Sequence, residues 1–152
     1  MGSALVERSM GIEKIAVLGA GQMGNGIAQV AACAGYDVTM IDIKQEYVDK
    51  GLAAIENSLS RVVKKERMTA EEAANALARV KIATDKSAAA DADLVVEAIP
   101  EIPDLKFSTF AELDQICKPE AILASNTSSI SINAIAAATS RPDRVIGMHF
   151  MN

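Results

Sequence analysis

The sequence is poor in aromatic residues: Phe, Tyr and Trp make up 3% of its 152 residues, and Trp is absent. A core without many large rings has to be built from Ala, Val, Ile and Leu, which suits layered proteins whose helices pack closely on a sheet. The length allows one domain with a sizeable core. The net charge is −5, without a long run of one sign. This argues against nucleic acid as the main partner, because phosphate binding requires a basic surface.

Cysteines and long apolar segments are also scarce. Cys33 and Cys117 are too few for a disulfide framework, and we interpret them as buried thiols in a reducing cytoplasm. No apolar run approaches the about 18 residues of a membrane span, so we expect no membrane partner. Residues 1–11 lack the apolar stretch of a signal peptide and are expected to form a flexible N-terminal tail.

Short apolar runs that alternate with helical patterns predict an α/β fold. We expect buried strands at 12–19, 36–42, 80–84, 92–99, 121–125 and 143–150. Apolar residues at helical spacing, a capping box that begins at Thr69 and a helix start at Pro103 predict helices at 22–35, 45–65, 69–79, 103–117 and 131–139. The order predicts a Rossmann-type, doubly wound and mainly parallel sheet in one domain, residues 12–152, with a helical hairpin inserted after the second strand.

Residues 19–24 read GAGQMG, a G-x-G-x-x-G pattern that follows the first predicted strand and opens the first helix. Glycines at these positions allow a tight turn, the close approach of a pyrophosphate and close packing of the helix on the strand, and the helix N-terminus favours the diphosphate charge. The residues expected to bind the cofactor here are Gly19, Gly21, Gln22, Met23 and Gly24. A purely structural glycine turn is the alternative, which the strand–loop–helix context disfavours.

Asp42 ends the second predicted strand, 18 residues after Gly24. At this position an acidic residue accepts hydrogen bonds from the ribose of the adenosine, and its charge would repel a 2′-phosphate. Lys44 lies nearby in the sequence and could soften that repulsion. We therefore expect NAD rather than NADP as the cofactor.

Polar residues also follow the later strands at the points where these strands end. Glu101 follows the fourth strand, Asn126 and Ser128 follow the fifth, and His149 lies at the end of the last. Ser and Asn are common in turns, and a histidine at a strand end is more often structural. Ligands of open α/β sheets, however, bind at the carboxyl ends of the strands, where these residues converge. Neutral imidazole suits a base that takes the proton of an alcohol as hydride leaves, and a serine hydroxyl could hold the substrate oxygen.

Four segments resemble one known family in both order and spacing. They are KIAVLGAGQMGNGIAQVAACAGYDVTMID (14–42), DLVVEAIPE (93–101), ASNTSSISI (124–132) and RVIGMHFMN (144–152). Together they resemble the NAD-binding domain of the L-3-hydroxyacyl-CoA dehydrogenases. The resemblance implies NAD-dependent oxidation of L-3-hydroxyacyl-CoA to 3-ketoacyl-CoA, in fatty-acid β-oxidation or butanoate metabolism, with acyl-CoA as the substrate.

The resemblance also implies roles for single residues. His149 matches the catalytic base, and Ser128 matches the serine that binds the substrate oxygen. The positions that match residues lining the cofactor are Glu101, Lys106 and Asn126. The positions that match CoA-contacting or other substrate-side residues are Ser58, Lys65 and Asn152. Ser58 and Lys65 share one face of the long predicted helix, which would suit a plain solvated surface equally well.

The sequence departs from the family pattern in two respects. Ile102 stands where the family usually has Asn. The family's second, all-helical domain supplies the carboxylate that orients the histidine and most of the dimer interface, and it has no counterpart in these residues. We therefore expect the chain to bind NAD, without a metal, but to turn over acyl-CoA poorly. The alternatives are a non-catalytic NAD- or CoA-binding module and a dehydrogenase of another hydroxy acid.

Overall fold

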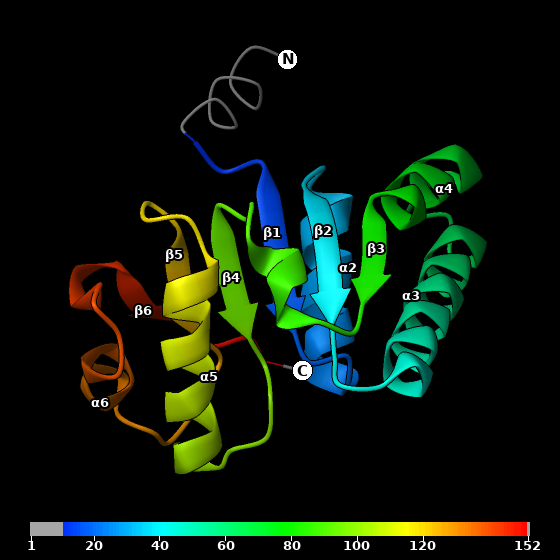
Figure 1. The fold of residues 1–152 in the computed structure, drawn as a ribbon. Helices are drawn as coiled ribbons and strands as arrows, with labels where there is room; N and C mark the ends of the chain where they lie inside the picture. The colour runs from blue at the N-terminus through cyan, green and yellow to red at the C-terminus, as the bar shows by residue number, and fades with distance from the viewer. Residues whose placement is uncertain (1–10, 152) are drawn as a thin grey trace.

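A single parallel sheet organises the chain. The computed structural model describes residues 11–151, so that most of the predicted tail (1–11) and Asn152 lie outside the described residues. The sheet has six strands in the order β3-β2-β1-β4-β5-β6, and all the pairings are parallel (Figure 1). The strands are β1 (Lys14–Leu18), β2 (Asp37–Ile41), β3 (Val80–Ala83), β4 (Leu94–Glu97), β5 (Ile122–Ser125) and β6 (Val145–Gly147). The predicted fold class is confirmed, and the order reverses direction between β1 and β4.

The last strand is shorter than predicted. We expected it to run to residue 150, but β6 ends at Gly147. The chain stays close to the sheet after that point through one further bond, because the N–H of Met148 donates to the carbonyl of Ser125 (2.9 Å). His149 therefore follows the strand instead of ending it.

The helices lie where the sequence predicts them. They are α2 (Gln22–Cys33), α3 (Gln45–Lys64), α4 (Ala70–Ala78), α5 (Pro103–Ile116) and α6 (Ile132–Ala137), with two short 3-10 helices, η1 (Lys86–Ala89) and η2 (Pro142–Arg144), that we did not predict. The capping box of α4 is present: Thr69 Oγ1 accepts from the N–H of Glu72 (3.1 Å), and the Glu72 carboxylate accepts from the N–H of Thr69 (3.2 Å). Pro103 occupies the first turn of α5.

Two apolar cores lie on opposite faces of the sheet. Val17, Met40 and Val96 point to the face covered by α2, α3 and α4. Leu18 and Val95 point to the face covered by α5, α6 and η1. Figure 1 shows α5 in front of the sheet and α2 behind it, which is the doubly wound arrangement. Both faces are buried, which explains why the strands are apolar without alternation.

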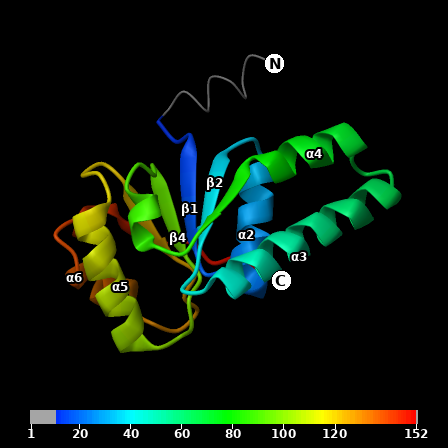
Figure 2. The same ribbon diagram turned by 45° about the vertical axis from the view of Figure 1, so that its right-hand side comes forward.

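The helical hairpin of α3 and α4 extends beyond the sheet (Figure 2). It is fixed at its base by Gly51 of α3, where a Cβ atom would lie 2.8 Å from the carbonyl oxygen of Ala20. The hairpin is therefore packed directly against the glycine loop.

One expectation about the cysteines was wrong. Cys117 is buried, but Cys33 is exposed, and neither forms a disulfide. The buried side of α2 is formed by Gly24, Ile27, Ala28 and Ala31. Because Gly24 packs against the loop, it fixes the rotation of this helix and turns Cys33 toward solvent.

Candidate functional site

The three glycines of the loop differ in what surrounds them. Gly19 has φ +105°, and a Cβ there would lie 2.5 Å from the carbonyl oxygen of Ala98. At Gly24 a Cβ would lie 1.8 Å from the carbonyl oxygen of Gly19. At Gly21, by contrast, a Cβ would meet nothing within 4 Å. The fold therefore requires Gly19 and Gly24, while Gly21 leaves open space at the N-terminus of α2, where the first N–H groups of a helix lack partners within it.

Asp42 is fixed by the loop that it faces. One carboxylate oxygen accepts from the N–H of Ala20 (2.9 Å), and the other accepts from the N–H of Ile43 (2.7 Å). Each carboxylate oxygen can accept a further hydrogen bond. The carboxylate therefore lies beside the glycine loop with acceptor capacity left for hydrogen bonds from the hydroxyls of a ribose.

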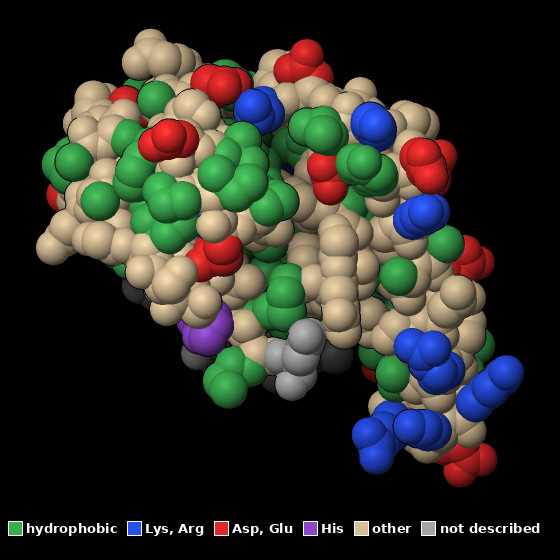
Figure 3. Space-filling view, turned by 90° about the horizontal axis from the view of Figure 1, so that it is seen from below, with side chains coloured by type: hydrophobic (Ala, Val, Ile, Leu, Met, Phe, Trp, Pro, Cys, Tyr) green, Lys and Arg blue, Asp and Glu red, His purple; other side chains and the backbone are tan. Residues whose placement is uncertain are grey.

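A cleft of about 1050 Å³ runs along the carboxyl ends of the strands. We call it the main cleft, and its predicted lining residues are Gly19, Gly21, Gln22, Met23, Asp42, Glu101, Lys106, Asn126, Ser128 and His149. Ile43, Tyr47, Leu105 and Thr109, which we did not predict, line it as well. Figure 3 looks at this end of the sheet and shows the single histidine at an exposed rim. Leu105 lies in the segment predicted as a helix (103–117), but no sequence pattern assigned it or the other three residues to a site.

A smaller cavity of about 300 Å³ adjoins the main cleft beside Asp42. Its walls include Leu18, Ile41, Ile99 and Ile116. These apolar side chains beside Asp42 suit the face of a flat ring such as adenine, while Thr84, Asp85, Lys86 and Glu112 make the rest of the wall polar.

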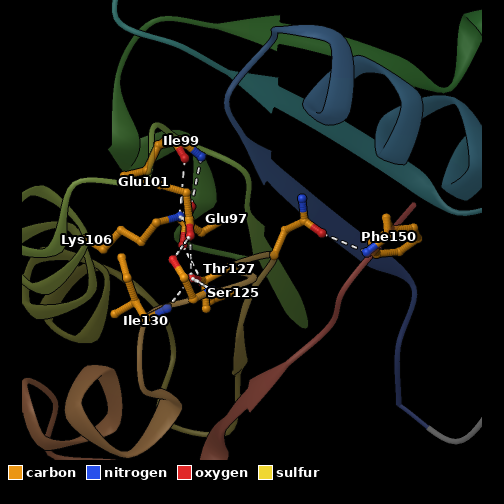
Figure 4. Close-up of polar contacts among 10 residues, drawn as sticks. Glu97, Ile99, Glu101, Lys106, Ser125, Thr127, Ile130 and Phe150 are labelled. Carbon is orange, nitrogen blue, oxygen red and sulfur yellow. Dashed lines mark hydrogen bonds and ion pairs between the residues drawn. The ribbon is translucent and has the colours of Figure 1, made fainter. Parts of the chain in front are cut away.

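Asn126 connects the ends of two strands. Its side-chain oxygen accepts from the backbone N–H of Phe150 (2.7 Å), which follows β6 (Figure 4). This bond holds the segment after β6 against the end of β5, so that His149 and Ser128 both line the main cleft. Both side chains are exposed, and within residues 11–151 no hydrogen bond or ion pair restrains the imidazole.

A buried charged network lies beneath the part of the main cleft that is formed by the loops after β4 and β5 (Figure 4). The Lys106 ammonium lies 2.6 Å from the Glu97 carboxylate and 2.9 Å from that of Glu101, and the side chains of Lys106 and Glu97 are 1% and 0% exposed. The second oxygen of Glu101 accepts from the hydroxyls of Thr127 (2.9 Å) and Ser129 (2.8 Å). Burial raises the pKa of Glu101, but the bonds from Lys106, Ser129 and Thr127 outweigh it and lower the pKa to about 2. Glu101 is therefore an anion at any physiological pH.

The predicted CoA-contacting residues lie apart from the main cleft. Ser58 is half-buried and Lys65 is exposed, on α3 and directly after it, and neither lines the cleft. Figure 3 shows basic side chains gathered at the far end of the hairpin, where Arg61, Lys64, Lys65 and Arg67 are exposed. Asn152 lies outside the described residues.

The described part of the chain holds neither of two further features. None of its helices combines the length and apolar character needed to cross a bilayer. No group of three or more His, Cys, Asp or Glu side chains within residues 11–151 is placed to hold a metal ion.

The strand order, the glycine loop at a helix N-terminus and the carboxylate at the end of β2 define a Rossmann-type dinucleotide-binding domain. A family model described as "3-hydroxyacyl-CoA dehydrogenase, NAD binding domain" matches residues 14–152. The chain belongs to this family, and NAD is its cofactor.

Relatives and solved structures agree with this assignment. The chain is 53% identical over 139 residues to a probable 3-hydroxybutyryl-CoA dehydrogenase of Deinococcus radiodurans, covering 91% of this chain and 50% of the relative. It is 50% identical over 141 residues to the 3-hydroxybutyryl-CoA dehydrogenase of Bradyrhizobium diazoefficiens, covering 93% of this chain and 48% of the relative. The crystal structure of (S)-3-hydroxybutyryl-CoA dehydrogenase from Ralstonia eutropha has a TM-score of 0.90 at 48% identity, covering 93% of this chain and 50% of that one. The chain thus spans about half the length of the curated relatives it matches.

Proposed function

We propose that residues 12–152 are the cofactor-binding domain of a dehydrogenase that oxidises L-3-hydroxyacyl-CoA to 3-ketoacyl-CoA, in fatty-acid or butanoate metabolism. The observation that carries the proposal is the main cleft, which joins a dinucleotide site to a serine and a histidine. Gly21 and Asp42 lie at one end of it, and Ser128 and His149 lie at the other.

The residues along the cleft indicate how the cofactor would be oriented in it. Asp42 at the end of β2 would hold the adenosine ribose, with the adenine in the adjoining smaller cavity. The open space at Gly21 would admit the diphosphate against the N-terminus of α2. The nicotinamide half would then extend toward the ends of β4 and β5, where Glu101 and Asn126 line the cleft.

The residues at this end suit alcohol oxidation. NAD, when bound, supplies the acceptor for the hydride that leaves the 3-carbon. The imidazole of His149 would take the hydroxyl proton, and the hydroxyl of Ser128 would donate a hydrogen bond to the oxygen as it becomes a carbonyl. In the opposite direction, protonated His149 would return that proton to the oxygen.

The proposal predicts binding without efficient turnover for the chain of 152 residues. Within the described residues no carboxylate contacts His149, so the orientation of its imidazole lacks the support that such a partner gives. We expect NADH titration, followed by nicotinamide fluorescence, to show binding, and acetoacetyl-CoA reduction to be slow. A chain that does not bind NADH would refute the proposal. Turnover comparable to that of a two-domain relative would refute the need for a carboxylate partner to His149.

The basic end of the hairpin supports acyl-CoA as the substrate. Ser58, Arg61 and Lys65 would meet the CoA phosphates there, because exposed cations and a hydroxyl suit phosphate oxygens. Lys65→Ala should weaken CoA binding while leaving NADH binding unchanged. Equal CoA affinity of the two proteins would argue for a different hydroxy acid as the substrate.

Two further features belong to this proposal. We place the protein in the cytoplasm, supported by two cysteines that form no disulfide. We also expect the complete enzyme to dimerise through a second, helical domain. Sedimentation of this chain beside the complete two-domain enzyme would test that expectation. A dimer formed by the chain of 152 residues alone would contradict it.

A further inference from the structure

We propose that the buried Glu97 carboxylate, through its ion pair with Lys106, is a positioning element for the nicotinamide half of the main cleft. The inference rests on the proposed function, because it assumes that NAD lies along the cleft. It assigns a role to Glu97, which lies entirely below the surface.

The hydrogen bonds of Lys106 are all used within the protein. An ammonium has three N–H donors and no acceptor. Its three partners are Glu97 Oε2 (2.6 Å), Glu101 Oε1 (2.9 Å) and the carbonyl oxygen of Ile99 (3.2 Å). These three contacts fix the ammonium at the wall of the main cleft, where 1% of the Lys106 side chain is exposed.

Glu97 accepts three hydrogen bonds and connects two loops. Its Oε2 atom accepts from Lys106 and from the N–H of Ile99 (2.8 Å), in the loop after β4. Its Oε1 atom accepts from the hydroxyl of Ser125 (2.6 Å) at the end of β5, and this hydroxyl in turn accepts from the N–H of Thr127 (3.2 Å). One buried carboxylate thus fixes the backbone after β4 and after β5.

Glu101 closes the network at the surface of the cleft. It is held by Lys106 from below and by the hydroxyls of Thr127 and Ser129 from the side. Its side chain is 39% exposed and lines the cleft, so it can still accept a bond from a ligand hydroxyl. Glu97, which does not reach the cleft, therefore acts on the ligand through Lys106 and Glu101.

The network lies under only one half of the cleft. In the strand order, β2 with Asp42 is on one side of β1, and β4 and β5 are on the other. Burying two opposite charges is costly, and apolar residues of similar volume can often replace such a pair without loss of stability. The pair should therefore be dispensable for folding and for adenosine binding, but not for binding of the nicotinamide riboside.

Two nucleotides separate these roles in an experiment. NADH occupies both halves of the cleft, whereas ADP has the adenosine and the diphosphate but no nicotinamide riboside. We would measure the affinity of both for the wild type and for Glu97→Met/Lys106→Met, which replaces the pair by apolar side chains. We expect ADP affinity to stay within about twofold and NADH affinity to fall by roughly tenfold, because Glu101 loses a charged hydrogen bond and its fixed position.

A second variant keeps the test decisive if the double variant does not fold. Ser125→Ala removes one hydroxyl and with it the link from Glu97 to the loop after β5. We expect it to weaken NADH, but not ADP, by roughly threefold to tenfold. The conservative change Glu97→Gln can keep an oxygen toward Lys106 and Ile99, and should retain most of the NADH affinity.

A matched control uses another buried ion pair that has one member on α5. Asp114 and Arg141 pair near the opposite end of α5, away from the main cleft. Arg141→Lys should lower stability without changing the ratio of NADH to ADP affinity.

Three outcomes would overturn the inference. One is equal weakening of both nucleotides in the Glu97 and Ser125 variants, which would indicate a merely structural role. Another is unchanged NADH affinity in these variants. The third is a wild type that binds ADP but not NADH, which would refute the proposed function and this inference together, whereas the first two leave the proposed function intact.

Discussion

The glycine loop allows a quantitative prediction. Replacing each of its glycines by Ala should impair the protein for a different physical reason. At Gly24 the added Cβ would lie 1.8 Å from the carbonyl oxygen of Gly19 and 2.5 Å from its carbonyl carbon. Both groups are backbone, so no side chain can move away. Helix α2 would have to withdraw from the loop by more than about 1 Å to reach ordinary contact distances.

The expected cost follows from overpacking. We expect Gly24→Ala to lower the free energy of unfolding by about 3 kcal/mol. For a chain of this size that corresponds to a fall in Tm of about 6–12 °C. Circular dichroism melting and urea unfolding would measure both quantities. NADH binding should be lost as well, since the helix N-terminus moves with the loop.

Two other glycines serve as controls. Gly21→Ala should fold with a loss within about 1 kcal/mol, because nothing lies near the new Cβ and only the helix cap is weakened. It should bind NADH at least about tenfold more weakly, because the methyl group fills the space meant for the diphosphate. Gly26→Ala lies inside α2 with nothing within 4 Å and should gain about 0.5–1 kcal/mol in stability. A Gly24→Ala protein as stable as the wild type, or a Gly21→Ala protein with full NADH affinity, would refute this reasoning.

The remaining predictions concern three other side chains. The wild type should prefer NADH to NADPH by at least about tenfold, and Asp42→Ser should remove most of that preference in parallel fluorescence titrations; a wild type that prefers NADPH would contradict the role of Asp42. Arg141 donates five hydrogen bonds, to the Asp114 carboxylate and to four carbonyl groups in and after α5. Arg141→Lys can satisfy fewer of these acceptors and should cost about 2–4 kcal/mol in urea unfolding; a loss below measurement error would show that water replaces the guanidinium. Glu101 has its pKa lowered from 4.5 to about 2 in the fold, so the stability it contributes is present above pH 4.5 and is lost as the pH falls toward 2. The stability difference between the wild type and Glu101→Gln should therefore be constant from pH 8 to about 5 and shrink below that range; a difference that persists to pH 2 would contradict the shift.

The sequence predicts the fold well because its signals are local. Apolar runs, the capping box at Thr69 and the proline at 103 each depend on a few neighbouring residues, and each lies where expected. The main cleft was also predictable in outline, since parallel strands deliver their following residues to one edge.

The rest depends on how backbone and side chains pack in three dimensions, which residue spacing alone does not report. The rotation of α2, which exposes Cys33, is set by the contact of Gly24 with Gly19 across a tight turn. The early end of β6 depends on pairing with β5, and the burial of Lys106 depends on its contacts with Glu97 at the end of β4 and with the loop that follows this strand. No spacing rule reports how many donors a buried side chain has already used.

The bond between Asn126 and Phe150 has a consequence for how mutants of this protein are interpreted. Asn126 lines the main cleft, and it also holds the segment that carries His149. A loss of activity in Asn126→Ala would therefore mix a weaker cofactor contact with a displaced base. Asn126→Asp keeps an oxygen to accept from Phe150 while it removes the amide donor, so that comparing the two variants separates the ligand contact from the placement of the histidine.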